Sequence, residues 1–274
     1  MVRWLVAIAV GALVARASCR QPKPDRVTIA TFNIEHFPKD ARQVEGAFDE
    51  IAASRASIVA AQEITDPAVF LAAARRRLAP SWDFVHDHRR IENHHHVGAL
   101  FDRRVWRFVS SEVHDDTRLG RLDLPVLEVR LAPVDGGDLV RVLVVHLRSQ
   151  TAGRPARARQ HEVLAKLAAA ARGSGERVVV LGDFNATEDG DRGDLAELAR
   201  AAGLVWATRS LPCTAFWRRD DGCPRSRLDH VLTSEPPTRA IATGGCATDG
   251  CDRQDRCPRF AEQISDHCPV VVEF

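Results

Sequence analysis

The chain contains 274 residues, of which 45% are hydrophobic and 27% are charged, and this composition excludes a chain that is disordered throughout. The formal net charge at pH 7 is +1 and the charged residues are mixed along the sequence, which excludes a bulk electrostatic attraction to nucleic acid or to anionic membranes. Any basic binding surface must therefore be local.

Residues 1–18 have the pattern of a secretory signal peptide. Arg3 precedes an apolar run over 4–14, and an A-x-A cleavage motif ends at Ala17. The run is too short to favour a permanent transmembrane helix. Cys19 follows two small residues, as in a bacterial lipoprotein site, although an arginine replaces the aliphatic residue expected three positions earlier. We therefore expect an exported protein that is secreted, periplasmic or lipid-anchored at the cell envelope through Cys19.

Residues 19–26 form a polar linker, and we expect one folded domain over 27–274. Short aliphatic and β-branched runs alternate there with helical patterns, and they predict strands at 27–34, 56–63, 97–102, 126–131, 139–147, 177–183, 227–234 and 268–274. Several runs are apolar on both faces, and such strands need cover on both sides. The sequence therefore favours a layered α/β or α+β architecture.

Two helices are predicted between these strands. Asp40 can cap a helix on which Val44, Phe48 and Ile51 recur at helical spacing. A second helix is expected over 155–173, because a proline begins it and a glycine ends it. No internal repeat accompanies these elements.

Six of the seven cysteines lie in the last quarter of the chain, in or near the segment 211–262, which is rich in cysteine, glycine, proline, arginine and aspartate. In an exported protein they would form three disulfides that replace the core such a segment cannot build. Sequence alone does not choose the connectivity. The simplest guess joins near neighbours, namely Cys213 with Cys223, Cys246 with Cys251, and Cys257 with Cys268. A zinc site is the alternative, but no spacing is C-x2-C.

Polar residues recur at the ends of the predicted strands. They are Asn33 with Glu35, Gln62 with Glu63, His146, Asp183 with Asn185, Asp229 with His230, and Asp266 with His267. Strand ends on one edge of a sheet converge in space, so this recurrence predicts a carboxylate-rich pocket. Asp183 and Asn185 are two positions apart, so on an extended segment both face the pocket while Phe184 packs the other way.

Six motifs carry a family resemblance: FNIEHF, AAQEI, VVHLRS, LGDFNA, RLDHVL and SDHCPV. Their order and approximate spacing, from residue 27 to 274, resemble the motif series of the endonuclease/exonuclease/phosphatase superfamily, which has the deoxyribonuclease I-like fold. The resemblance implies a four-layer α/β sandwich in which two mixed β-sheets pack face to face with helices on the outer faces. It also implies a divalent-metal phosphohydrolase site at one rim.

Phosphoester hydrolysis needs a hard cation, a positioned water and donors for the charge that develops on phosphorus-bound oxygen. Glu63 is the leading candidate ligand for Mg²⁺, with Mn²⁺ as the alternative ion, because a carboxylate on a rigid strand end suits an oxygen-seeking cation. Asn33 and Asp266 are assigned to the same metal and hydrogen-bond shell. Glu35 adds a second carboxylate there, although an exposed loop acid is an equally good interpretation.

The catalytic assignments follow from the same motifs. Asp183 would orient or deprotonate water, and Asn185 would donate to a phosphoryl oxygen. Asp229 resembles the family's acid that orients the histidine of SDH, here His267, as a carboxylate does when it fixes an imidazole tautomer. His146 resembles the family's mid-sheet histidine, a general acid or a transition-state donor. The sequence leaves open whether Asp183 or His267 activates water.

Arginines near the predicted rim are the candidate substrate contacts. Arg89 and Arg90 lie in the cationic loop 86–96, and Arg148 and Arg154 flank the start of the second predicted helix. A solvated loop and a solvated helix face explain them as well. Nothing in the chain reads base edges, so a nucleic acid would be recognised through its backbone.

These features together predict an exported, metal-dependent phosphodiesterase, a nuclease with little sequence specificity that acts as a monomer. The alternatives are a phospholipid phosphodiesterase of the sphingomyelinase-like branch, a phosphatase on the same site, and a non-catalytic tethered binding module. The last is disfavoured because all six motifs keep their polar residues. The choice of DNA or RNA, endo or exo action, and one metal or two remains open.

Overall fold

The computed structural model describes residues 27–88, 95–120 and 123–274. The predicted signal peptide (1–18), the linker (19–26) with Cys19, and the candidate substrate contacts Arg89 and Arg90 lie outside this described part. Within it, no helix combines the length and the apolar character needed to cross a bilayer.

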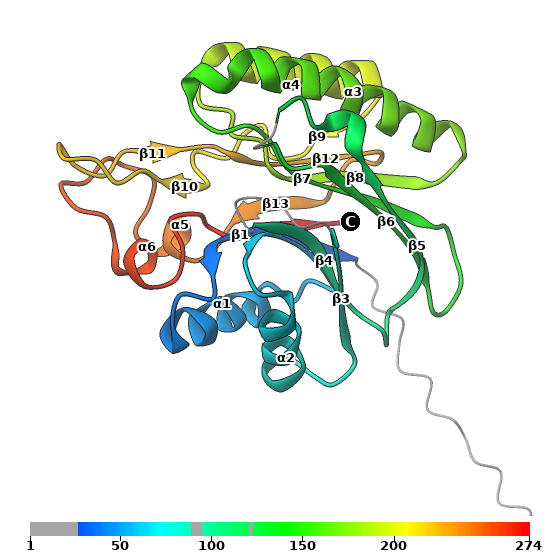
Figure 1. Ribbon diagram of the computed structural model, residues 1–274, viewed down its shortest axis with the longest axis horizontal. Coiled ribbons are helices and arrows are strands. Elements are labelled where there is room, and N and C mark those ends of the chain that lie inside the picture. The colour runs from blue at the N-terminus through cyan, green and yellow to red at the C-terminus, as the bar shows by residue number, and fades with distance from the viewer. Residues whose placement is uncertain (1–26, 89–94, 121–122) are drawn as a thin grey trace, which may run out of the picture.

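Two six-stranded mixed β-sheets form the centre of the molecule (Figure 1). The first has the order β13-β14-β1-β2-β4-β3, and its strands are β1 (Thr28–Phe37), β2 (Ile58–Ile64), β3 (Trp82–His86), β4 (His96–Asp102), β13 (Arg239–Ala242) and β14 (Val270–Glu273). The second has the order β5-β6-β7-β8-β12-β9, and its strands are β5 (Trp106–His114), β6 (Val126–Pro133), β7 (Val140–His146), β8 (Arg177–Asp183), β9 (Val205–Trp206) and β12 (Asp229–Thr233). Among the strand pairs of the described residues, only β1–β2 and β7–β8 are parallel.

Helices cover the outer face of each sheet, so the predicted four-layer sandwich is confirmed (Figure 1). The helices α1 (Ala41–Ser54) and α2 (Pro67–Arg77) lie on the first sheet, and α3 (Arg154–Gly173) and α4 (Asp189–Ala202) lie on the second. The remaining elements are β10 (Ala215–Phe216), β11 (Arg225–Ser226), α5 (Gly245–Thr248), α6 (Arg259–Gln263) and the 3-10 turns η1 (Asp115–Thr117) and η2 (Thr151–Gly153).

Three apolar layers explain why the predicted strands are apolar on both faces. Ile58, Val142 and Leu181 belong to the layer between the sheets. Phe48 belongs to the layer beneath α1 and α2, and Leu164 to the layer beneath α3 and α4. Each central strand therefore buries both rows of its alternating side chains, as the pattern predicted.

The helix predicted after Asp40 is confirmed as α1. The Asp40 carboxylate accepts a hydrogen bond from the backbone N–H of Gln43 at 2.8 Å, which satisfies one of the free donors at the helix start. Phe48 and Ile51 lie on its buried face. The helix ends at Arg55, which adopts a left-handed conformation with φ of 54°.

A fully buried ion pair joins α3 to α4 and fixes the loop after β7. The Arg157 guanidinium contacts both oxygens of Asp191, at 2.9 and 2.8 Å. It also donates to the carbonyl oxygens of Arg148 and Gln150, at 2.8 and 2.7 Å. Removing one partner of such a pair would leave a buried charge uncompensated. Because Arg157 also binds two carbonyl groups of the β7–α3 loop, the ion pair attaches this loop to α4.

His161 of α3 is buried against Phe184, and neither of its ring nitrogens has a hydrogen-bond partner among the described residues. Burial lowers its pKa to about 4. In the unfolded chain this histidine is protonated below about pH 6.5, whereas in the folded protein it stays neutral down to about pH 4. Protonation therefore stabilises the unfolded state first, and the free energy of unfolding decreases as the pH falls between these values.

Replacing His161 with leucine should remove this pH-dependent decrease in stability. Urea denaturation at pH 7 and pH 5 should show that the pH-dependent decrease in unfolding free energy is smaller by about 2 kcal/mol in His161→Leu than in the unmodified protein. The exposed His88, replaced in the same way, is the control and should leave the difference unchanged. An unchanged pH dependence in His161→Leu would show that the imidazole takes up its proton in the folded state.

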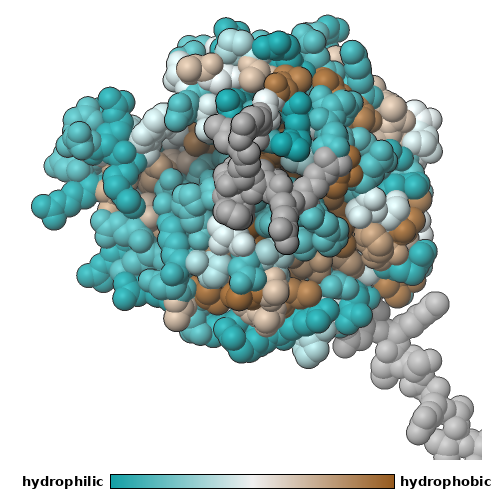
Figure 2. All heavy atoms as spheres, in the orientation of Figure 1, coloured by the Kyte–Doolittle hydropathy of each residue, from teal (hydrophilic) through white to brown (hydrophobic). Residues whose placement is uncertain are grey.

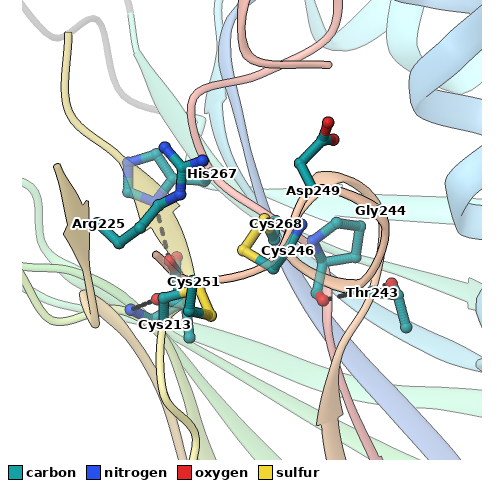
Figure 3. Close-up of a disulfide and its surroundings, with 12 residues drawn as sticks. Cys213, Arg225, Thr243, Gly244, Cys246, Asp249, Cys251, His267 and Cys268 are labelled. Carbon is teal, nitrogen blue, oxygen red and sulfur yellow. Dashed lines mark hydrogen bonds and ion pairs between the residues drawn. A yellow bond between two sulfur atoms is a disulfide. The ribbon is translucent and has the colours of Figure 1, made fainter. Parts of the chain in front are cut away.

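Three disulfides are confirmed, but the predicted pairing of near neighbours is wrong. The bonds are Cys223–Cys257 and the two that Figure 3 shows, Cys213–Cys251 and Cys246–Cys268. The β10–β11 hairpin explains the error: Ala215 pairs with Ser226 and Phe216 with Arg225, so Cys213 and Cys223 are held at opposite ends of it. All six sulfurs are consumed, which excludes the zinc alternative for these cysteines.

The disulfides give the segment 211–262 a small core of its own. Cys213, Cys223, Cys246 and Cys268 are buried together with Phe216 and Ala261. Cys268 directly follows His267, and the Cys246 N–H donates to its sulfur at 3.0 Å. The segment is therefore bonded to the chain at Cys268, between the SDH motif and β14.

Candidate active site

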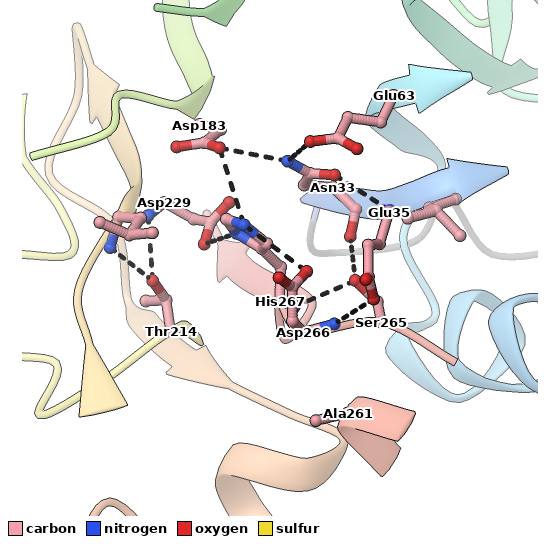
Figure 4. Close-up of polar contacts among 12 residues, drawn as sticks. Asn33, Glu35, Glu63, Asp183, Thr214, Asp229, Ala261, Ser265, Asp266 and His267 are labelled. Carbon is pink, nitrogen blue, oxygen red and sulfur yellow. Dashed lines mark hydrogen bonds and ion pairs between the residues drawn. The ribbon is translucent and has the colours of Figure 1, made fainter. Parts of the chain in front are cut away.

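The polar strand ends from both sheets meet at one rim. In the second sheet, His146 pairs with Asp183 across β7–β8, and Asp183 pairs with Asp229 across β8–β12. These three residues therefore lie side by side on adjacent strands. Asn33 of β1 faces Asp183 from the first sheet, as Figure 4 shows.

The backbone after β8 is turned sharply to present this edge. Gly182 has φ of 146°, and a Cβ there would lie 2.0 Å from the carbonyl oxygen of Val145, so only glycine fits. Asn185 is left-handed with φ of 50°. Its N–H donates to Asp183 Oδ1 at 2.8 Å, and its side-chain amide donates to the carbonyl of Leu147 at 3.0 Å.

Asp183 and Asn185 line the same cavity, but the extended geometry predicted for them is wrong. The turn at Asn185, rather than strand alternation, directs its side chain to the cavity. Phe184 is buried on the other side, in the layer beneath α3 and α4, as expected.

Asn33 bridges two carboxylates that come from different sheets. Its amide nitrogen donates to Glu63 Oε1 and to Asp183 Oδ2, both at 3.1 Å (Figure 4). Its amide oxygen accepts from the backbone N–H of Glu35 at 3.0 Å. Asn33 thus presents its nitrogen, not its oxygen, to Glu63 and Asp183, and it fixes their separation.

The carboxylate of Glu35 is directed away from Asp183. It forms an ion pair with Lys39 at 2.7 Å and accepts from the backbone N–H of Asp266 at 3.1 Å. Glu35 therefore positions the start of the SDH segment from the edge of the site.

Asp229 and His267 form a buried pair. His267 Nδ1 lies 2.8 Å from Asp229 Oδ2, and its Nε2 lies 3.7 Å from Asp183 Oδ2. The backbone N–H of Asp229 donates to the hydroxyl of Thr214 at 2.9 Å. Burial opposes the charged imidazole, but the charges of Asp229 and Asp183 outweigh it and raise the pKa of His267 well above its usual range. The pair therefore favours the protonated form of the His267 imidazole.

His146 reaches the same carboxylates from β7. Its Nε2 lies 3.6 Å from Asp183 Oδ2 and 4.0 Å from Glu63 Oε1. Its buried Nδ1 has no hydrogen-bond partner among the described residues. The ring thus presents one nitrogen to the cluster, slightly beyond direct hydrogen-bond distance of both carboxylates.

The oxygen donors of the site fit a hard divalent cation. Burial alone would raise the pKa of Glu63, but the neighbouring histidines His146, His267 and His95 and the Asn33 hydrogen bond lower it to about 2. Partial burial, with the charges of Glu35 and Glu63, raises the pKa of Asp266. Carboxylates that crowd one another in this way are stabilised by a bound cation, and oxygen donors are those that Mg²⁺ and Mn²⁺ prefer.

These side chains open into a cavity of about 520 Å³. Its polar lining is Glu63, His95, Asp123, His146, Arg148, Ser149, Gln150, Asp183, Asn185 and His267. Arg148 forms an ion pair with Asp123 at 3.2 Å on the cavity wall. Arg154 does not line the cavity, because its guanidinium pairs with Asp194 of α4 at 3.2 Å.

Asp123 lines the cavity but was not predicted from the sequence. A single aspartate in a loop belongs to no motif and has no spacing pattern that would indicate a site.

The model of the endonuclease/exonuclease/phosphatase family matches residues 30–267. The chain belongs to this family. Endonuclease/exonuclease/phosphatase enzymes are hydrolases of phosphoester bonds and generally depend on a divalent metal, and the site described above has the side chains for such chemistry. A sequence search of curated proteins gives no match.

Solved structures of family members share the fold. A humanised TDP2 from D. rerio superposes with a TM-score of 0.70 at 16% identity, covering 91% of this chain and 98% of that one. D. rerio TDP2 in complex with a single-stranded DNA product superposes with a TM-score of 0.67 at 15% identity, covering 91% of this chain and 98% of that one. A Bacteroides thetaiotaomicron mannosyl-6-phosphatase gives 0.64 at 16% identity, with 90% and 98% covered.

Proposed function

We propose that this protein is an exported, divalent-metal-dependent phosphodiesterase that hydrolyses nucleic-acid phosphodiester bonds with little sequence preference. The observation that carries the proposal is the position of Asp183 Oδ2. It lies 3.1 Å from the amide nitrogen of Asn33, 3.6 Å from His146 and 3.7 Å from His267. One buried carboxylate is thus fixed from three sides and kept ionised, in a position from which it can orient an attacking water.

The buried contact between His267 and Asp229 supports separate roles for His267 and Asp183, which the sequence could not distinguish. His267 is held as an imidazolium by Asp229 and so acts as a donor to a phosphoryl oxygen. Asp183 is then the base that accepts a proton from the attacking water. His146 is placed to donate a proton to the leaving oxygen.

Glu63 and Asp266 would hold a divalent ion, Mg²⁺ first and Mn²⁺ second, which supplies charge neutralisation on the phosphoryl oxygens. Asn33 keeps Glu63 Oε1 and Asp183 at a fixed separation. Asn185 orients Asp183 through its backbone N–H. Arg148, on the cavity wall, is the described arginine best placed to contact a substrate phosphate.

Nucleic acid is favoured over lipid by the surface beside the site. The β10–β11 hairpin projects from the molecule and is hydrophilic over its tip (Figure 2). Its loop carries Arg218, Arg219, Asp220 and Asp221. A hairpin that enters a membrane carries several apolar side chains at its tip, whereas this one exposes only Trp217 beside four charged residues, which argues against a bilayer as the substrate.

The three disulfides support export, because such bonds persist in oxidising compartments. Removal of residues 1–18 as a signal peptide, a lipid on Cys19 and a monomeric state belong to the same proposal. Mass spectrometry of the mature N-terminus tests the first two.

The proposed substrate class is tested by incubating the protein with plasmid DNA, single-stranded DNA, RNA, sphingomyelin and a sugar phosphate in the presence of Mg²⁺. We expect cleavage of nucleic acid and its loss when a chelator is added. Hydrolysis of sphingomyelin or of the phosphomonoester alone would replace the nuclease proposal with the corresponding alternative. No hydrolysis of any substrate would favour a binding module.

A further inference from the structure

A cluster of two imidazoles and one carboxylate lies beside the candidate active site. His36 Nδ1 is 2.6 Å from His95 Nε2 and 3.8 Å from Glu63 Oε2. One ligand atom from each of the three residues lies within 4.8 Å of those of the other two. The two carboxylate oxygens of Glu63 have different surroundings. Oε1 accepts a hydrogen bond from Asn33, whereas Oε2 accepts one from the backbone N–H of His36 and faces the rings of His36 and His95.

The register of the first sheet gathers these residues. Phe37 pairs with Ile64, and Ile64 pairs with His96, across β1, β2 and β4. His36, Glu63 and His95 each stand one position before a member of this row. Irregularities in both strand pairings, with φ of 56° at His36 and 60° at Glu63, turn the side chains toward one another.

The donor set differs from that of the candidate magnesium site. Imidazole nitrogen and carboxylate oxygen together are typical ligands of zinc and its neighbours, whereas magnesium favours oxygen alone. At 2.6 Å, at most one of the two facing nitrogens carries a hydrogen, so at least one lone pair is directed into the cluster. Bonds of about 2.0–2.1 Å to one tetrahedral ion separate two ligand atoms by roughly 3.3 Å.

The distances from His36 Nδ1 to His95 Nε2 and to Glu63 Oε2, 2.6 and 3.8 Å, lie on either side of the roughly 3.3 Å expected between two ligands of one tetrahedral ion. The side chain of His36 is 59% exposed, so its ring can rotate to equalise them without disturbing a packed neighbour. The cluster therefore needs only a small rearrangement to hold an ion and remains accessible to it from solvent.

We propose that His36, His95 and Glu63 bind a zinc-like divalent cation through imidazole nitrogen and carboxylate oxygen, next to the candidate magnesium site. Glu63 is shared between the two sites, one oxygen to each. The inference extends the proposed function without depending on it, because cation binding is measured directly.

Two other groups of potential ligands in the described part of the chain are less suited. Asp87, which lies with His86 and His96, is fully buried, and one of its oxygens is 2.6 Å from His96. Glu128, which lies with Glu112 and His114, already pairs with Arg141 at 3.2 Å. A cation at either place would displace a contact that the fold already uses.

The test is a titration of the full-length protein with Co²⁺ in excess Mg²⁺, followed by Zn²⁺ as competitor. We expect one equivalent of Co²⁺ to give the visible absorption of a four- or five-coordinate ion, and Zn²⁺ to abolish it. His36→Ala and His95→Ala should each weaken Co²⁺ binding by more than about tenfold. His86→Ala and His114→Ala are the matched controls and should retain it.

Unchanged Co²⁺ binding in His36→Ala and His95→Ala would overturn the proposal, as would its loss in either control alone. X-ray absorption of the zinc-loaded, unsubstituted protein gives an independent measurement that requires no variant to fold. It should show two imidazole ligands, and a first shell of oxygen alone would also overturn the proposal. Asp183→Asn should retain the cobalt absorption while losing hydrolysis, so failure of this inference and failure of the proposed function give different results.

Discussion

Replacing Asp183 with asparagine should lower kcat for phosphodiester hydrolysis by about a thousandfold or more, which is the loss expected when a buried general base is removed. The amide cannot accept the proton of water. Asparagine also removes the negative charge that His146 and His267 face at 3.6 and 3.7 Å. Because Asp183 is only 2% exposed, the substitution alters the site and not the surface.

The measurement is steady-state kinetics on an oligonucleotide substrate with Mg²⁺, with the unfolding free energy of both proteins determined in parallel. Asp189→Asn is the matched control, because that carboxylate on α4 is 96% exposed and lies outside the cavity. Its kcat should equal that of the unmodified protein. A kcat for Asp183→Asn within a few-fold of the unmodified value would remove Asp183 from the mechanism.

Replacing Cys246 and Cys268 together with alanine should lower the free energy of unfolding by about 3 kcal/mol, the entropy of closing a loop of this length in the unfolded chain. The bond joins positions 22 residues apart, and Cys268 is fully buried. The variant should also lose activity, because His267 is the residue next to Cys268 and depends on this attachment to face Asp229.

Urea denaturation and the oligonucleotide assay measure the two effects. The double variant Cys223→Ala/Cys257→Ala is the control, because it opens a comparable loop of 34 residues farther along the chain from His267. It should lose similar stability and keep more activity. Equal activities in the two double variants would show that the Cys246–Cys268 bond stabilises the segment without positioning His267.

The sequence predicts the central strands well because their signal is local. β8 spans the predicted residues because four aliphatic residues end at Gly182 and Asp183. β5 was missed, since it lies at the edge of its sheet, and Trp106 is its only fully buried side chain. α4 was missed as well, because its first two turns are polar and contain two glycines, and its apolar face begins only at Leu195.

The site is predictable where a motif fixes a residue to a strand end, and less so elsewhere. His146, Asp183 and Asp229 are brought together by strand register, which the motif order already implied. Asp123 faces the cavity only through the tertiary path of its loop. Arg154 is close in sequence to strand β7, which ends at the rim, but its pairing with Asp194 of α4 depends on how α3 and α4 pack. Disulfide partners depend in the same way on a hairpin that the sequence did not reveal.

The hydrogen bonds of Asn33 connect the first sheet to Asp183 of the second, so the reaction centre spans the seam of the sandwich. The span between the two halves is set by the thickness of the aliphatic layer to which Val142 and Leu181 belong. Interior methyl groups far from any ionisable side chain are therefore expected to tune the proposed chemistry, because a slightly thinner or thicker layer would change how far Glu63, the candidate cation ligand, stands from Asp183, the candidate base.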